Sequence, residues 1–286
     1  MDVTRTVWTF TPRGGPEELF GVGDATERAG GVRLEMAAGR WTLDDDGALC
    51  AGALGVLVDD ALGNAMINPM PDGYWPVSTE ISVDVVARPP GAPNVLTAVS
   101  HRLDDLADGF GGGALAQGRV LDGAGRTIAV ATMRGRYVPV GDREPLATYG
   151  TIPPGTTGRR EAAPGVSALL GGAVRRRGAD VEFALPADPA FTNPLGVTHG
   201  GILLCGSEIA GRRALCAAGA SLTTASVHIA YLRPVPTTGP LMFTAEVVHS
   251  GRTLGVARVT GRAVSSDRPG TVATVICHDE TLPATS

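Results

Sequence analysis

The sequence predicts an α+β fold in which two antiparallel sheets are each wrapped around a central helix. Two segments, 51–66 and 200–211, have apolar residues on nearly every face, which is typical of helices buried on all sides. Runs of alternating apolar and polar residues follow each segment and predict strands. The same order of elements occurs in both halves of the chain. A strand, one buried helix and a four-stranded meander share a core when the sheet covers the helix.

The strands of each half are located by their alternating pattern. In the first half we expect strands at 32–43, 78–89, 94–103, 113–122 and 126–138. In the second half we expect a strand around 184–185 and others at 225–235, 241–251, 255–266 and 271–280. Residues 139–165 are rich in Pro, Gly and Arg and are interpreted as a linker. The 286 residues are therefore divided into an N-terminal domain at 26–140 and a C-terminal domain at 165–281.

An internal repeat supports this division. At an offset of 148 residues the two halves align at several positions: 51–53 with 199–201, Asp60 with Glu208, and His101 with His249. At an offset of 145, the Arg-Pro pair at 88–89 aligns with the pair at 233–234. We expect the halves to form an internal pseudo-dimer whose sheets pair edge to edge. A homo-oligomer would then use other surfaces.

Composition and charge exclude several classes of function. The formal net charge of −5 argues against a nucleic-acid binder. All 24 basic residues are Arg, so Schiff-base chemistry at a lysine is excluded. The N-terminus lacks the pattern of a signal peptide, and the longest apolar run, 48–58, is too short to span a bilayer. We therefore expect a cytoplasmic protein with no nucleic-acid or membrane partner.

Cysteine and histidine spacing indicates neither a disulfide nor a metal site. No CxxC pair occurs, and four cysteines in apolar surroundings are expected to be reduced and buried: Cys50, Cys205, Cys216 and Cys277. The five histidines show no HxH or HxxxH spacing, which argues against a metal site. The glycine-rich segment 109–113 is not followed by GK[ST], so a phosphate loop is not expected. No cofactor is predicted.

The most specific motif in the chain precedes the second apolar helix. From Asn193 to Gly201 the sequence reads Asn-Pro-x-Gly-x-x-His-Gly-Gly, and the acid Glu208 follows His199 by nine residues. This motif resembles the start of the central helix in hotdog-fold acyl-CoA thioesterases of the phenylacetate-pathway (PaaI-like) type. The resemblance implies a tandem double hotdog that hydrolyses acyl-CoA thioesters without a metal. The first half is the weaker match, because it lacks the His and the Asn of the motif.

Thioester hydrolysis needs one group that polarises the carbonyl and another that activates or replaces water. Free N–H groups at a helix start stabilise the oxyanion, and glycine at position 200 lets a carbonyl approach. A carboxylate acts as general base or nucleophile. Gly200 and Glu208 are eight residues apart, about 12 Å along one helix, which is too far for one thioester. If the central helices are antiparallel, each helix start works with the acid of the other half.

Two composite sites follow from this spacing. Site A combines a complete motif with the acid of the first half: Asn193, His199, Gly200 and Asp60. Site B combines residues 51–52 with Glu208. The resemblance implies that Asn193 holds the water or the carbonyl and that Ser78 supports the catalytic acid. Because site A alone has the complete motif, we expect it to be the working site, and we interpret Asp59 as a surface acid.

Simpler interpretations exist for several of these residues. Asn193 can belong to a plain turn, and His199 can serve only to shape the loop. Asp60 can be a surface acid, and Glu208 can pair with Arg212 one helical turn later. The Arg run at 175–177 is interpreted as a solvated face. Three arginines could reach the phosphates of coenzyme A: Arg88, Arg233 and Arg252.

Three functions are compatible with the motif. Acyl-CoA thioesterase is the first. The second, enoyl-CoA hydratase, needs an Asp and a His at positions that hold Phe191 and Gly196, which argues against it. The third is a non-catalytic acyl-CoA-binding or regulatory protein, because one half has lost motif residues. The sequence leaves the acyl group open, although a loop after the first helix could shape its pocket through Met70, Tyr74 and Trp75.

Overall fold

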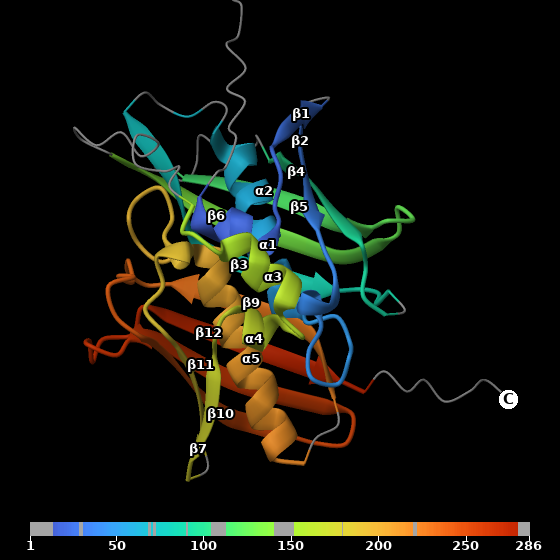
Figure 1. Ribbon diagram of the computed structural model, residues 1–286, viewed down its shortest axis with the longest axis vertical. Coiled ribbons are helices and arrows are strands. Elements are labelled where there is room, and N and C mark those ends of the chain that lie inside the picture. Colours follow the sequence, from blue (N-terminus) through green and yellow to red (C-terminus); the bar gives the residue numbers. More distant parts are fainter. Residues whose placement is uncertain are drawn as a thin grey trace, which may run out of the picture.

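The computed structural model describes residues 14–28, 31–67, 70, 73–89, 91–103, 113–139, 152–178, 180–219 and 222–279. They form one continuous antiparallel sheet of twelve strands with helices on one of its faces (Figure 1). The α+β double hotdog is thus confirmed, with the two predicted sheets joined into one. The join is the antiparallel pairing of β3 (Tyr74–Val85) with β9 (Thr223–Tyr231), which is the expected edge-to-edge contact. The glycine-rich loop at 109–112 and the linker portion at 140–151 lie outside the described residues.

The strand order repeats between the halves. It runs β2-β4-β5-β6-β3 in the first half and, mirrored across the join, β9-β12-β11-β10-β8 in the second. The first half contains β1 (Thr26–Arg28), β2 (Gly31–Ala37), β4 (Val95–Arg102), β5 (Gly113–Asp122) and β6 (Thr127–Pro139). The second half contains β7 (Ala173–Arg177), β8 (Asp180–Leu185), β10 (Leu241–Ser250), β11 (Leu254–Ala263) and β12 (Thr271–His278).

Two predicted strands of the first half had wrong boundaries. β2 ends at Ala37 rather than at residue 43, because the 3₁₀ turn η1 (Arg40–Thr42) turns Trp41 onto Phe20, with ring centroids 5.4 Å apart. β3 begins at Tyr74 and not at 78. Pro76 argued against a strand here, because proline lacks the N–H that a central strand needs for pairing on both sides. The pairing of β3 with β9 covers only residues 80–84, so residue 76 pairs with β6 alone. Among the described strands, no second one lies there to need the missing N–H.

Each half of the sheet wraps one central helix, as predicted. α2 (Gly55–Ile67), which follows the 3₁₀ turn η2 (Ala51–Leu54), packs on the first half. α5 (Gly200–Ala217) packs on the second half (Figure 1). Both helices are buried along most of their length. Their apolar sides form one continuous core with the inward residues of the strands.

The two central helices cross at their N-terminal ends and run in opposite directions. A Cβ on Gly201 would lie 2.5 Å from the backbone of Gly55 and Val56, and a Cβ on Gly55 would lie 2.4 Å from the carbonyl oxygen of Gly201. A Cβ on Gly52 would likewise lie 3.0 Å from the backbone of Cys205. Glycine therefore lets the two backbones touch. As a result, the start of each helix lies beside the second turn of the other.

Three short helices pack near this crossing: α1 (Gly15–Phe20), α3 (Thr156–Ala162) and α4 (Val166–Leu169). The 3₁₀ turn η4 (Pro189–Phe191) lies beside α1. α3 belongs to the predicted linker, so this part of the linker is folded. The Arg160 guanidinium and the Thr157 hydroxyl both donate hydrogen bonds to Glu18 of α1. α1 was not predicted, because six residues are too few to show a helical period.

Other predictions about the surface have mixed outcomes. Cys50, Cys205 and Cys277 are buried free thiols, but Cys216 is exposed, so its predicted burial was wrong. Cys216 lies in the last turn of α5, where the burial of that helix ends. The Arg run at 175–177 lies in the exposed edge strand β7, in agreement with its interpretation as a solvated face. In the part of the chain that the structure describes, no helix is long and apolar enough to cross a bilayer.

The helix crossing gives a stability prediction. Gly201→Ala should lower the free energy of unfolding by about 1–3 kcal/mol, because the new methyl group must displace the backbone of α2. Gly63→Ala is the matched control, since its Cβ meets no atom within 4 Å. This control should raise the free energy of unfolding by about 0.5–1 kcal/mol, as expected for Gly replaced inside a helix. Urea unfolding followed by circular dichroism measures both, and equal effects would contradict the close helix contact.

Candidate active site

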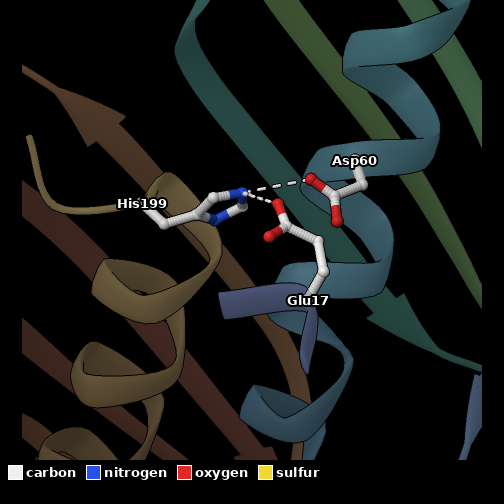
Figure 2. Close-up of side chains that lie close together, drawn as sticks. All are labelled: Glu17, Asp60 and His199. Carbon is white, nitrogen blue, oxygen red and sulfur yellow. Dashed lines mark hydrogen bonds and ion pairs between the residues drawn. The ribbon is translucent and has the colours of Figure 1, made fainter. Parts of the chain in front are cut away.

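His199 is the centre of the candidate site, where the two helix starts cross. It is the N-cap residue of α5 and is 5% exposed. Its Nε2 lies 3.1 Å from Asp60 Oδ1 and 3.8 Å from Glu17 Oε1. Figure 2 shows both carboxylates directed at the same ring nitrogen. On the other edge of the ring, Nδ1 lies 3.2 Å from Asp59 Oδ2. Three carboxylates from α1 and α2 therefore surround one imidazole of the second half.

Asp59 is the carboxylate closest to the start of α5. Its Oδ2 accepts a hydrogen bond from the Gly201 amide at 2.9 Å, and its Oδ1 accepts one from the Ser78 hydroxyl at 2.7 Å. Two predictions were wrong here: Asp59 is largely buried, with 11% of its side chain exposed, and Ser78 supports Asp59 rather than Asp60. Adjacent residues on a helix point about 100° apart, so both acids can reach α5. Spacing alone cannot tell which acid Ser78 meets.

Asp60 meets the His199 ring across the two halves, as predicted for site A, and it is not a surface acid. Its Oδ2 is buried and has no hydrogen-bond partner among the described residues. Burial raises the pKa of Asp60, the charge and hydrogen bond of His199 lower it, and the charge of Asp59 raises it. The net shift is upward. The carboxylate is therefore more basic than an ordinary aspartate.

The carboxylates keep the His199 ring protonated. Burial lowers the pKa of His199, but the charges of Asp59, Asp60 and Glu17 and the hydrogen bond to Asp60 outweigh it and raise the pKa to about 10. At neutral pH the ring is thus an imidazolium whose Nε2 donates to Asp60 and whose Nδ1 lies beside Asp59 Oδ2. The Gly201 amide lies 3.0 Å from Nδ1. With Nδ1 protonated, that amide donates to Asp59.

Asn193 shapes the loop before α5. Its side-chain Oδ1 accepts hydrogen bonds from the amides of Leu195 at 3.0 Å and Val197 at 3.2 Å. Gly196 completes the turn with a left-handed φ of 78°. The plain-turn interpretation therefore accounts for the oxygen of Asn193. The residue also lines the adjoining cavity, so its NH₂ group is the part that could meet a ligand.

A cavity of about 560 Å³ adjoins the cluster, which is within the range of small-molecule sites. Asp59, Asp60, His199 and Gly200 contribute polar groups to its wall. Among the described residues, none accepts a hydrogen bond from the Gly200 amide. Of the three residues expected to shape a pocket, only Trp75 lines this cavity. The other apolar walls come from α2, α5, β3 and the loops at 193–199 and 231–235, through Met66, Ile67, Val77, Leu195, Val197, Leu203 and Val235.

In site B, Glu208 lies beside Cys50, the residue before the predicted partners at 51–52, but the site is closed. Glu208 is 1% exposed and accepts hydrogen bonds from Cys50 Sγ at 2.9 Å and from Thr224 Oγ1 at 2.5 Å. Both of its oxygens are therefore satisfied. Arg212 forms ion pairs with Asp44 and Asp46 instead of the expected bridge to Glu208. The cavity beside Glu208 holds only about 10 Å³, too little for a substrate.

The three arginines considered for coenzyme A lie in different surroundings. Arg88 donates to the backbone carbonyls of Leu49 and Thr224, on the side of site B. Arg233 lines the cavity of site A and donates to the Pro269 carbonyl at 2.6 Å. Arg252 is exposed in the turn between β10 and β11 and does not line this cavity.

Glu17 is the residue of this cluster that no sequence motif singles out. It is 2% exposed and comes from the unpredicted helix α1. One ligand atom each of Glu17, Asp60 and His199 lies within 4.8 Å of the others, and such a trio could hold a metal ion. A cation and a proton at His199 Nε2 exclude each other, because both need the same lone pair. Sequence spacing places Asp60 with His199 but not Glu17, because Glu17 lies in a short helix outside both repeats.

Fold and site together define a double-hotdog protein with one open composite site. Residues 188–278 match the family described as acyl-CoA thioesterase N-terminal domain, although the match lies in the C-terminal half of this chain. No curated protein matches the sequence. The chain is thus a double-hotdog protein whose second half matches this family model, in the half that carries the motif.

Solved structures resemble almost the whole chain. Acyl-CoA thioesterase II TesB2 from Mycobacterium marinum has a TM-score of 0.58 at 11% identity, covering 94% of this chain and 98% of that one. The tesB protein from Mycobacterium avium subs. paratuberculosis has a TM-score of 0.58 at 9% identity, covering 89% and 95%. An acyl-ACP thioesterase from Bacteroides thetaiotaomicron has a TM-score of 0.54 at 12% identity, covering 87% and 98%. At these identities the likeness establishes the fold.

The charge cluster gives a titration prediction. In ¹H–¹³C NMR spectra, the His199 ring should titrate with a midpoint near pH 10, well above its ordinary 6.5, because three carboxylates face it. Comparison with His199→Gln assigns the resonance. A His199 midpoint near 6.5 would show that the carboxylates do not hold the ring as an imidazolium.

Proposed function

We propose that the protein hydrolyses an acyl-CoA thioester to a free acid and CoA at site A, with Asp60 as general base. The observation that carries the proposal is the second oxygen of Asp60, which is buried without a hydrogen bond in a residue that lines the cavity. Because Oδ2 is buried, the carboxylate must turn toward the cavity to meet water, which would then supply the missing hydrogen bond. The acyl-CoA thioesterase domain at 188–278 supports the same reaction class.

The proposed reaction uses groups from both halves. The Gly200 amide, at the positive end of α5, donates to the carbonyl oxygen as it becomes an oxyanion. Asp60 takes a proton from water as the water oxygen bonds to the carbonyl carbon. The intermediate then breaks its C–S bond, and the sulfur leaves as thiolate and takes up a proton. One water and one thioester thus give one acid and one thiol.

Asp59 limits how a substrate carbonyl can enter. A Cβ on Gly200 would lie 2.5 Å from Asp59 Oδ2, so the carbonyl oxygen must occupy a narrow space beside this carboxylate. A negative charge there opposes an oxyanion. The His199 imidazolium, 3.2 Å from the same oxygen, offsets that charge. We propose that His199 acts in this way and that Asn193 contributes its NH₂ group to water or carbonyl binding.

The lining of the site A cavity supplies the proposed contacts to the substrate. Of the three arginines considered for CoA, Arg233 alone lines the site A cavity, and we propose it as a phosphate contact. The apolar walls suit an acyl chain. We also propose a cytoplasmic location, which three buried free thiols support.

A non-catalytic acyl-CoA-binding protein is the second candidate. The observation that favours it is the hydrogen bond from the Gly201 amide to Asp59, which occupies one donor of the helix start. Tight binding without CoA release would establish this function. The hydratase reaction receives no support, because Phe191 is 1% exposed and Gly196 lies in a tight turn, so neither position supplies its acid or base.

The working carboxylate is identified by comparing three isosteric variants. Asp60→Asn should lower single-turnover CoA release by about 10²–10⁴, the usual contribution of a positioned base, with acyl-CoA binding largely kept. Glu208→Gln should cost much less, because Glu208 lies in the closed site. Asp59→Asn is the nearest control and should cost less than Asp60→Asn, since Asp59 already accepts two hydrogen bonds.

Other outcomes assign the chemistry elsewhere. A greater loss for Asp59→Asn than for Asp60→Asn would make Asp59 the base. Loss at Glu208→Gln with activity kept in Asp60→Asn would mean that site B is catalytic. Circular dichroism of each variant separates loss of chemistry from loss of fold.

A further inference from the structure

Glu17 reaches the site from a helix that precedes the two repeats. Its carboxylate is 2% exposed, and its Oε1 lies 3.8 Å from His199 Nε2 (Figure 2). The other two acids at this ring come from adjacent positions of α2. Glu17 is therefore the one carboxylate at this ring that does not come from α2.

Helix α1 is held by packing on its inner side and by hydrogen bonds on its outer side. A Cβ on Gly15 would lie 2.5 Å from Ala190 Cα, so α1 touches the backbone just before the motif loop. Leu19 and Phe20 are fully buried. On the outer side, Glu18 receives the hydrogen bonds from α3. Burial of a carboxylate is costly, and an acid held this firmly inside the protein needs a compensating charge.

His199 supplies that charge. Its ring is the cationic group that faces Glu17, and the ring is also faced by Asp59 and Asp60 from α2. From β9, the Tyr231 hydroxyl donates to the Gly200 carbonyl next to the ring. Among these groups only the carboxylates add negative charge at neutral pH. Each of them raises the pKa of His199.

We infer that Glu17 is a positioning residue of the site, whose carboxylate holds His199 as an imidazolium oriented between Asp59 and Asp60. The role in catalysis rests on the proposed function, whereas the effect on the ring does not. Glu17 acts through His199, because its interaction with the cluster is with that ring. When Glu17 is neutral, the ring loses its proton at a lower pH, and above that pH Asp60 no longer has a charged donor.

A bound divalent cation is the competing explanation of the same trio. The ring geometry favours the proton. Nε2 forms a hydrogen bond with Asp60 Oδ1 at 3.1 Å, which a proton on Nε2 completes. Nδ1 lies 3.2 Å from Asp59 Oδ2, and the Gly201 amide is directed at both of these atoms. A cation at Nε2 would replace the hydrogen bond to Asp60.

The test compares Glu17→Gln with Glu18→Gln, its neighbour on the same helix, in the full chain. Glu17→Gln should lower the NMR titration midpoint of His199 by about 1 unit or more, because an opposite charge near the ring is removed. It should also shift the alkaline limb of the pH–rate profile for CoA release to lower pH by about as much as the His199 midpoint falls. At neutral pH, kcat and KM should change little, because the ring is still protonated there. Glu18→Gln should change neither the midpoint nor the profile. Glu17→Asp, which keeps the charge, should restore most of the midpoint.

An unchanged His199 midpoint in folded Glu17→Gln would overturn the inference. If that variant does not fold, the wild-type protein decides: the ¹³C carboxyl resonance of Glu17 should shift as His199 titrates, and no shift would overturn it. Metal analysis of the purified protein must also give no bound ion. A stoichiometric metal, whose removal by chelator changes the His199 resonance, would likewise reject the inference. Absence of CoA release in every variant, wild type included, would reject the proposed hydrolysis while leaving the titration result valid.

Discussion

The contact between the two helix starts is the constraint on which the site depends. Gly55 and Gly201 let the backbones of α2 and α5 touch, and the shared sheet, joined through β3 and β9, holds both helices in that relation. One helix start and the acid on the same helix are about 12 Å apart, so the two can act on one thioester only across the crossing. The crossing brings the acids of α2 to the start of α5. The contacts of Asp59 and Asp60 with His199 in site A depend on it.

The two composite sites differ in how their acids are satisfied. Glu208 has two neutral donors, Cys50 and Thr224, and a closed surrounding, so it behaves as a structural buried acid. Asp60 has one charged donor, a second oxygen without a hydrogen bond, and a cavity beside it. A buried polar atom without a partner destabilises the fold, and proteins keep such atoms where they serve a function. The asymmetry thus favours chemistry at site A on physical grounds, independent of the motif.

Much of this architecture could be predicted, because the periodic spacing of apolar residues and the internal repeat indicate it. Buried helices, alternating strands and the repeat at an offset of 148 located both halves, their order and the pairing of His199 with Asp60. Side-chain direction could not be predicted in the same way. Asp59 and Asp60 are neighbours in sequence, and only the rotation of α2 decides that Ser78 meets Asp59. Glu17 lies in a six-residue helix with no period to read and reaches His199 through tertiary packing alone.

We propose that the start of α5 and the acids of α2 together form one substrate site. A crystal structure with an acyl-CoA analogue, in which a methylene group replaces the thioester sulfur, tests it most directly because such a ketone cannot be hydrolysed. We expect the ketone oxygen to lie about 3 Å from the Gly200 amide, with the carbonyl carbon beside Asp60 and the acyl chain in the 560 Å³ cavity. An analogue bound beside Glu208, or one whose ketone lies away from the start of α5, would contradict it.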